Sequence, residues 1–198
     1  MDHEYYMGLA LDLAREAAAA GEVPVGCVIV HDGEVVGRGR NRREEKQAVF
    51  SHAEMEAMAQ ANAALGSWRL EDCALYVTLE PCPMCAGAII NARIPRVYYG
   101  ARDREMGACG GVLNIFMERF PHHPALVGGI LEEQCRQVLT DFFKGLRKRE
   151  KLVNEEEKKY TEKLAQEFGD DPECRVVANM REREMTDKEI YSILKSFW

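Results

Sequence analysis

The chain has 198 residues, of which 46% are hydrophobic, and a net charge of −7 at pH 7. This length supports one substantial core with residues left over, so we expect one domain and an appendage. No run reaches the ~18 apolar residues of a membrane span, and residues 1–22 lack the basic start of a secretory signal, which predicts a cytoplasmic protein without a membrane partner. In that reducing compartment we expect the seven cysteines to be thiols or metal ligands rather than disulfides. The acidic balance argues against a dedicated nucleic-acid binder, although basic side chains cluster in 38–43 and 144–149.

Helical and strand patterns alternate along the first 150 residues. Apolar residues at helical spacing predict helices, and short β-branched or apolar runs predict strands. In chain order we expect a helix over 3–20, a hairpin over 25–39, a loop over 41–50, a helix over 51–66, a strand over 74–79, a helix over 81–93, a strand over 96–100, a turn over 113–117, a strand over 125–127 and a helix over 131–149. This order predicts an α/β fold with three layers, α/β/α, around a five-stranded mixed sheet.

The composition changes after about residue 150. Residues 155–168 have a charged helical pattern, and 169–173 read as a break. Thr186 and Glu189 match a capping box ahead of apolar residues at helical spacing. We therefore expect residues 1–150 to form the domain and 151–198 a helical C-terminal extension. We favour packing of this extension on that domain, and a separate docking module is the alternative.

Residues 78–90 read TLEPCPMCAGAII and place two cysteines three positions apart where a predicted strand gives way to a helix. Pro81 and Pro83 suit the first helical turn, where missing backbone donors cost little. Cys82 and Cys85 then share one face at the positive end of the helix dipole, which favours thiolates. A redox dithiol of the thioredoxin type, a structural metal site and a catalytic metal site all use this spacing.

His52 adds an imidazole at the start of an earlier predicted helix. Together with Cys82 and Cys85 it would give zinc three protein ligands, the number that leaves a fourth position for water in catalytic sites. A structural site would need a fourth ligand, for which His31, His122 and His123 are candidates. The count of ligands alone leaves both kinds of zinc site open.

Glu54 is the carboxylate nearest to His52 in the predicted helix. Attack of a zinc-activated water on an aromatic amine carbon also needs a group that moves protons, and Glu54 is the candidate. Because positions i and i+2 lie on opposed faces of a helix, Glu54 is not expected to be a ligand beside His52. The alternative is structural, since Ser51 and Glu54 also match a capping box.

The combination of His52-Ala53-Glu54 with Pro81-Cys82-Pro83-Met84-Cys85 is the signature of zinc nucleobase deaminases. Over roughly residues 3–150 the chain resembles the bacterial tRNA-specific adenosine deaminases, which convert adenosine to inosine at the wobble position of an anticodon. The resemblance also covers AAAAGEVPVGCVIV, GRGRNRR, RVYYGARDREMGACGG and DFFKGLRKR. The zinc motifs alone would equally fit cytidine, cytosine or guanine deaminases.

The resemblance implies a cytidine deaminase-like fold, with residues 1–150 as a zinc-dependent deaminase domain. It assigns Zn²⁺ to His52, Cys82 and Cys85, and proton transfer to Glu54. It further implies a homodimer that binds the tRNA anticodon loop. The residues that it places near the substrate are Asn41 at the flipped-out nucleoside, Asp103 near the RNA backbone, and Phe142, Phe143, Arg147 and Lys148 near the anticodon loop.

Two further residues are candidates for contact with the base. Val25 belongs to an apolar stretch that could flank a purine, although an ordinary core role is equally open, and Ala53 could supply backbone groups around the base. The loop 114–123 and the extension 151–198 depart from the family pattern, so neither receives a role. Two other functions remain open: a zinc-dependent deaminase of a free nucleobase or nucleoside, and a zinc-stabilised binding module without catalysis.

Overall fold

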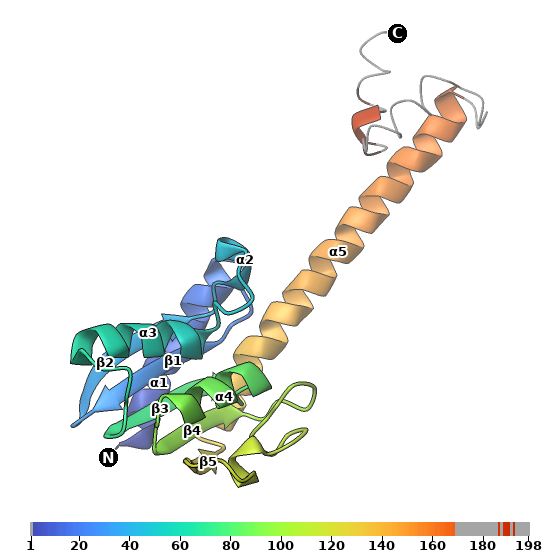
Figure 1. The fold of residues 1–198 in the computed structure, drawn as a ribbon. Coiled ribbons are helices and arrows are strands. Elements are labelled where there is room, and N and C mark those ends of the chain that lie inside the picture. The colour runs from blue at the N-terminus through green and yellow to red at the C-terminus, as the bar shows by residue number, and fades with distance from the viewer. Residues whose placement is uncertain (1, 169–185, 187, 191, 193–198) are drawn as a thin grey trace. The chain divides into compact units, whose positions relative to one another are not determined.

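The computed structural model describes residues 2–168, 186, 188–190 and 192 (Figure 1). The chain divides into two compact units, Met1–Phe142 and Phe143–Trp198. The break expected over 169–173 lies outside the described residues. No helix in the described ranges combines the length and the apolarity that crossing a membrane requires.

The first unit is built on a mixed sheet of five strands, as predicted. The strands are β1 Gly26–His31, β2 Glu34–Arg40, β3 Cys73–Leu79, β4 Arg96–Ala101 and β5 Ala125–Gly128. They lie in the order β2-β1-β3-β4-β5. β1 pairs antiparallel with β2 and β3, whereas β3, β4 and β5 run parallel.

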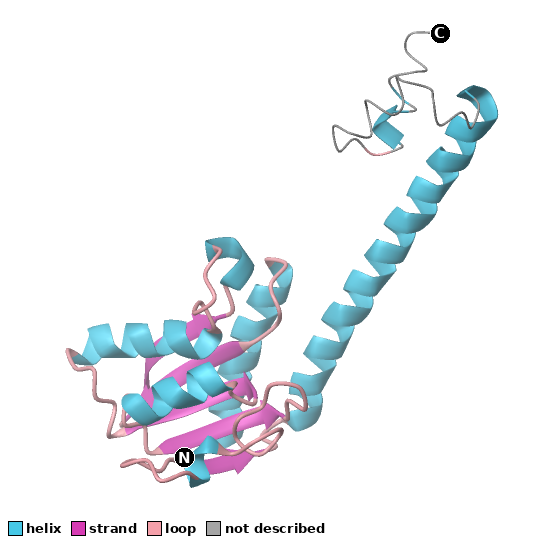
Figure 2. Ribbon diagram, turned by 45° about the vertical axis from the view of Figure 1, so that its right-hand side comes forward, coloured by secondary structure: helices cyan, strands magenta, loops and turns pink. Residues whose placement is uncertain are grey.

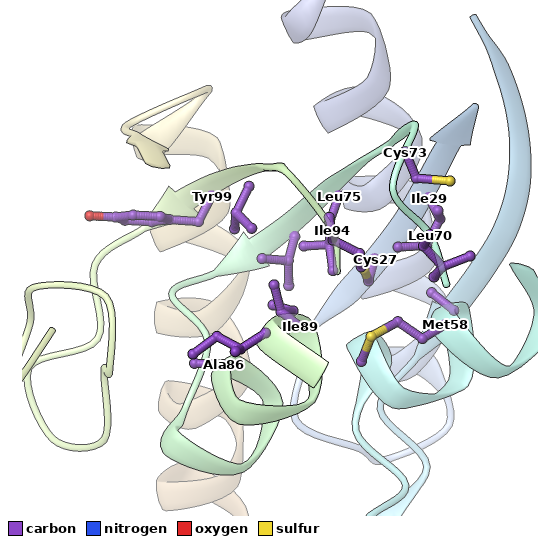
Figure 3. Packing of buried hydrophobic residues seen from close by; sticks show 14 of the residues in the cluster. Cys27, Ile29, Met58, Leu70, Cys73, Leu75, Ala86, Ile89, Ile94 and Tyr99 are labelled. Carbon is purple, nitrogen blue, oxygen red and sulfur yellow. The ribbon is translucent and has the colours of Figure 1, made fainter. Parts of the chain in front are cut away.

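Helices cover both faces of this sheet, which completes the three predicted layers (Figure 2). α3 Ala53–Leu65 and α4 Pro83–Asn91 pack on one face through Ala57, Met58, Ala86 and Ile89. α1 His3–Ala19 packs on the other face through Tyr6, Met7, Ala10 and Leu11. Because successive strand residues point to opposite faces, β1 sends Cys27 and Ile29 into the first core and Val28 and Val30 into the second. Figure 3 shows part of the first core, which includes Ile29, Leu75 and Ile89.

β2 approaches the first two turns of α3 closely because two of its residues are glycines. A Cβ atom on Gly39 would lie 2.1 Å from the Ala53 carbonyl oxygen, and one on Gly37 would lie 2.3 Å from the Ala57 carbonyl oxygen. Only glycine therefore fits at these two positions without moving α3. This contact sets the depth at which the start of α3 sits on the sheet.

Several helices differ from the sequence prediction, including α4, which covers Pro83–Asn91 instead of 81–93. A short helix, α2 Arg43–Lys46, lies in the expected loop. α3 begins at Ala53 with His52 as its N-cap, not at Ser51. The helix expected to end near 149 continues into the charged pattern, so that α5 runs unbroken over Glu132–Phe168, because residues 150–154 contain no glycine or proline to end it. The turn expected over 113–117 contains a short 3-10 helix, Ile115–Met117.

The second unit contains the part of α5 from Phe143 onward and a few described residues near the C-terminus. Thr186 and Glu189 form the predicted capping box: the Thr186 N–H donates to Glu189 Oε2 at 2.9 Å, and the Glu189 N–H donates to Thr186 Oγ1 at 3.3 Å. Lys188 Nζ lies 2.7 Å from Glu156 Oε1 on α5. The described residues of the tail thus contact α5 within this unit, while packing on residues 1–150 remains a prediction.

Candidate metal centre and nucleoside site

The starts of α3 and α4 lie on the same face of the sheet and bring three metal-binding side chains together. His52 is the N-cap of α3, Cys82 is the N-cap of α4, and Cys85 lies in the first turn of α4. Pro83 occupies the first helical position, where its fixed φ suits the helix. Pro81 was expected in the first turn but lies before the N-cap.

The three side chains are spaced as ligands of one metal ion. His52 Nδ1 lies 3.8 Å from Cys82 Sγ and 3.6 Å from Cys85 Sγ, and all three ligand atoms lie within 4.8 Å of one another. A tetrahedral zinc ion with ordinary bond lengths would separate a nitrogen and a sulfur ligand by about 3.6 Å. The cluster therefore has the size that a zinc ion requires.

No fourth His, Cys, Asp or Glu joins this cluster within the described part of the chain. The three candidates for a fourth ligand have other contacts. His122 Nε2 lies 2.8 Å from the Ile94 carbonyl, His123 Nδ1 lies 3.1 Å from the Phe116 carbonyl, and His31 lies 3.7 Å from Asp32. The geometry therefore disfavours a structural site closed by one of these histidines.

The charges at the centre suit metal binding. A hydrogen bond from Cys85 lowers the pKa of Cys82 to about 4, and the same hydrogen bond raises the pKa of Cys85. The hydrogen bond to Cys82 raises the pKa of His52. The site therefore favours a thiolate at Cys82, and a bound metal would recruit both sulfurs as thiolates.

Glu54 lies beside this centre as a buried carboxyl, with only 4% of its surface exposed. Burial raises its pKa to about 7. The alternative capping role of Glu54 is wrong, because His52 and not Ser51 is the N-cap, and the Ser51 N–H donates to the Ala48 carbonyl at 3.1 Å. Glu54 is therefore a buried acid close to a metal-binding cluster, with a pKa near neutrality.

Asn41 lies at the end of β2, between the start of β1 and the start of α3. Its N–H donates to the Val25 carbonyl at 3.0 Å, and the next residue, Arg42, donates its N–H to the Ser51 carbonyl at 3.0 Å. The Asn41 side chain is 8% exposed and donates through Nδ2 to Glu22 Oε2 at 3.1 Å. Sequence reasoning missed Glu22, because nothing in its local pattern signals a partner 19 residues away.

Comparison with known proteins agrees with this geometry. The model of a family described as MafB19-like deaminase matches residues 1–147. A tRNA-specific adenosine deaminase of Bacillus subtilis (strain 168) is 48% identical over 151 residues, which are 76% of this chain and 94% of that protein. A tRNA-specific adenosine deaminase of Streptococcus pyogenes serotype M3 is 44% identical over 153 residues, which are 77% of this chain and 90% of that protein.

The chain belongs to the tRNA-specific adenosine deaminases. A solved structure from a study of A-to-I editing by tRNA:A34 deaminases at the wobble position is 45% identical, with a TM-score of 0.66. It matches 68% of this chain and 99% of its own length. The predicted cytidine deaminase-like fold and the prediction of an adenosine deaminase enzyme are confirmed.

Another buried carboxylate of the deaminase, Glu80, organises the loop after β4. Glu80 is 2% exposed and accepts the N–H groups of Asp103 at 3.1 Å, Cys109 at 2.9 Å and Gly111 at 2.7 Å. Asp103 itself caps a turn, since its Oδ1 accepts the N–H groups of Glu105 and Met106. The loop is thereby tied to the residue two positions before Cys82. The pairing escaped sequence reasoning because the partners lie 23 to 31 residues away.

The remaining predicted contacts of the deaminase lie at or beyond the boundary of the first unit. Phe142 ends the first unit and is partly buried, whereas Phe143 is 41% exposed. Arg147 and Lys148 are exposed on α5 in the second unit. Their contact with RNA stays a prediction.

Proposed function

We propose that this chain hydrolyses adenosine to inosine at the wobble position of a tRNA anticodon, releasing ammonia. The observation that carries the proposal is the cluster of His52, Cys82 and Cys85 beside buried Glu54, in a chain 48% identical to a tRNA-specific adenosine deaminase. The cluster matches the His-x-Glu and Pro-Cys-x-x-Cys signature of nucleobase deaminases.

His52, Cys82 and Cys85 would hold Zn²⁺ in this proposal. One imidazole and two thiolates suit zinc, and three protein ligands leave a position for water. When bound, the zinc lowers the pKa of a water molecule to about 7 and so supplies the nucleophile. The spacing of His52 Nδ1 and the two sulfurs, 3.6–3.8 Å, supports this assignment.

Glu54 is the proton carrier in the same proposal. Its pKa of about 7 allows the carboxyl group to gain and lose a proton at neutral pH with little energetic penalty in either direction. Glu54 takes a proton from the attacking water and delivers it to the ring nitrogen. It then carries the second proton to the departing amine, which leaves as ammonia.

Asn41, Val25 and Ala53 would surround the flipped-out nucleoside. Asn41 is held at the end of β2 by its bond to the Val25 carbonyl, and Val25 packs on the edge of the first core. Ala53 is the first helical residue of α3, directly between His52 and Glu54. Its N–H belongs to the positive end of that helix and is a suitable hydrogen-bond donor to the base.

The tRNA would meet two surfaces outside the nucleoside site. Lys144, Arg147, Lys148 and Lys151 follow the spacing i, i+3, i+4 and i+7, which places them on one face of α5. Basic side chains in a row suit RNA phosphates, and exposed Phe143 suits stacking with an unpaired base. The second surface is the loop after β4. There Asp103 accepts hydrogen bonds that shape the turn at 104–106.

Homodimerisation, which the resemblance implies, belongs to the same proposal. A groove between α3 and α4 is lined by Met55, Met58 and Trp68, and Trp68 is 58% exposed. We assign this surface to the second copy, because covering it removes the exposed Trp68 ring from water. Analytical ultracentrifugation should give a dimer for the native chain and a lighter species for Trp68→Glu; a monomeric native chain would contradict the assignment.

The decisive experiment compares substrates under one set of conditions. The zinc-loaded protein is incubated with a tRNA that carries adenosine at the wobble position, with the same tRNA carrying guanosine there, and with free adenosine, cytidine and guanine. We expect inosine only in the first sample. Turnover of a free base or nucleoside without RNA would favour the first alternative, and no deamination of any sample would favour a binding module.

A further inference from the structure

Glu22 is a buried carboxylate to which the deamination chemistry above gives no role. Only 1% of its surface is exposed. Gly21, with φ of 80°, and a bond from the Glu22 N–H to the Ala17 carbonyl at 2.9 Å turn the chain after α1 and direct this residue inward. Burying a carboxylate costs free energy unless hydrogen-bond donors compensate it. The donors that bond to Glu22 therefore indicate which segment it positions.

Both oxygens of Glu22 accept hydrogen bonds from the segment that follows β2. Oε2 accepts from Asn41 Nδ2 at 3.1 Å, and Oε1 accepts from the Glu45 N–H at 2.6 Å. A carboxylate can only accept, so it selects the NH2 end of the Asn41 amide and turns the carbonyl end away. In the described part of the chain, Asn41 Oδ1 has no hydrogen-bond partner, so it remains available as an acceptor.

We propose that Glu22 is a positioning residue of the deaminase, which orients the Asn41 amide so that Oδ1 accepts a hydrogen bond from the nucleoside. The inference rests on the proposed deamination of tRNA and on the place of Asn41 beside the start of α3. A single amide rotation exchanges an acceptor for a donor at the nucleoside. Glu22 therefore sets the polarity of this contact without touching the substrate.

The substitution Glu22→Gln tests the inference with little change in size. The amide of the new side chain has one acceptor oxygen, whereas Glu22 accepts from two donors, Asn41 Nδ2 and the Glu45 N–H. If that oxygen accepts from Glu45, the new NH2 group faces Asn41 and favours the flipped Asn41 amide, with Oδ1 toward position 22. We expect kcat/KM for the tRNA to fall about tenfold, the loss that corresponds to one hydrogen bond. Zinc content should not change, and Glu16→Gln, an exposed carboxylate on α1, should behave as the native chain.

A double-mutant cycle with Asn41→Ala separates positioning from general support of the fold. If Glu22 acts through Asn41, Glu22→Gln should change kcat/KM less than about twofold in the Asn41→Ala background. An equal loss in both backgrounds would mean that Glu22 supports the fold and does not act through the Asn41 amide.

The reciprocal pair Glu22→Gln with Asn41→Asp should recover most of the activity. The new amide at position 22 then donates to one oxygen of the new carboxylate at position 41, and the other oxygen of that carboxylate faces the nucleoside as an acceptor. Asn41→Asp alone opposes two carboxylates and should be less active than the pair. The comparison of this pair with Asn41→Asp still tests the inference if the Glu22→Gln protein does not fold.

The outcomes that contradict the inference differ from those that contradict the proposed function. Native activity of Glu22→Gln, or an equal loss with and without Asn41, would overturn the role of Glu22 in a preparation that makes inosine. Lack of inosine from the native, zinc-loaded chain would overturn the proposed function and this inference with it.

Discussion

His52 Nδ1 lies 3.6 Å from Cys85 Sγ, although the two residues are 33 positions apart in the chain. The sheet order brings them together: β2 leads toward α3, β3 leads into α4, and both strands flank β1. The two helices therefore start at the same edge of the sheet, and because both pack on one face, their positive ends lie close to the sulfurs. That concentration of positive potential favours thiolates and, with them, a cation that they can bind.

Glu54→Gln should give a folded protein that retains zinc and has lost activity. Removing a proton carrier lowers kcat by about 10²- to 10⁴-fold. The thermal midpoint should stay or rise, because the change replaces a buried acid by a neutral amide. Glu56→Gln is the matched control, since Glu56 lies two residues along α3 and pairs with Lys46 at 2.7 Å. An active Glu54→Gln protein would contradict the proton-transfer role.

Cys85→Ala should lose the metal, because it removes one of the three proposed ligands. Elemental analysis of the purified protein should give about one zinc per native chain and close to none for this variant. Cys73→Ala removes a buried thiol of β3 outside the cluster and should keep the metal. Chelation of the native protein should lower its thermal midpoint. Equal zinc in Cys85→Ala and native protein would rule out the proposed ligand set.

The thiols outside the cluster should label slowly at pH 8. Burial raises the pKa of Cys73 to about 11 and those of Cys109 and Cys135 to about 12. Cys174 lies outside the described residues, so the test uses protein in which it is replaced by alanine. With zinc bound, this Cys174→Ala protein should show no fast reaction with a disulfide reagent, because only thiolates react. In the unfolded state these thiols ionise near their ordinary pKa of 9, whereas the folded state keeps them protonated. The free energy of unfolding should therefore decline as pH rises from about 9 toward 12. Rapid labelling of Cys73 at pH 8 would be inconsistent with this account.

Gly39→Ala should destabilise the first unit, whereas Gly87→Ala should not. The new Cβ on residue 39 would lie 2.1 Å from the Ala53 carbonyl and must displace the first turn of α3. We expect a loss of about 1–3 kcal/mol or more and a lower zinc content, since His52 precedes Ala53. A Cβ on Gly87, inside α4, meets nothing within 4 Å, so Ala there should stabilise by ~0.5–1 kcal/mol. Chemical unfolding measures the free energy of unfolding of both variants. A Gly39→Ala protein as stable as Gly87→Ala would contradict this prediction.

Alanine substitutions at Lys144, Arg147 and Lys148 should each weaken tRNA binding and lower its dependence on salt. A lost phosphate contact reduces the slope of log affinity against log salt by about 1. Arg136→Ala is the control, because this exposed α5 residue is paired with Glu133. Filter binding over a range of salt concentrations measures both quantities. Unchanged slopes would mean that this face of α5 does not meet the RNA.

Local patterns in the sequence were sufficient to predict the strands, the three-layer fold and the cluster of His52, Cys82 and Cys85. Each of these depends on short-range rules: the two-residue alternation of strands, the 3.6-residue period of helices, and fixed spacings at helix starts. The capping box at Ser51 was wrong for a related reason. The match of Ser51 and Glu54 does not show that the Ser51 backbone bonds to Ala48 and Arg42 instead. In the structure His52 is the N-cap.

Only the tertiary structure revealed what supports the site. Glu22 meets Asn41 across 19 residues, and Glu80 reaches a loop up to 31 residues away. The sequence does not show whether a carboxylate is buried or exposed, because burial depends on which segments pack over the residue. The chemistry of the centre is therefore determined by residue types at local spacings, whereas the orientation of the groups around it is decided by contacts that form only when the sheet and its helices assemble.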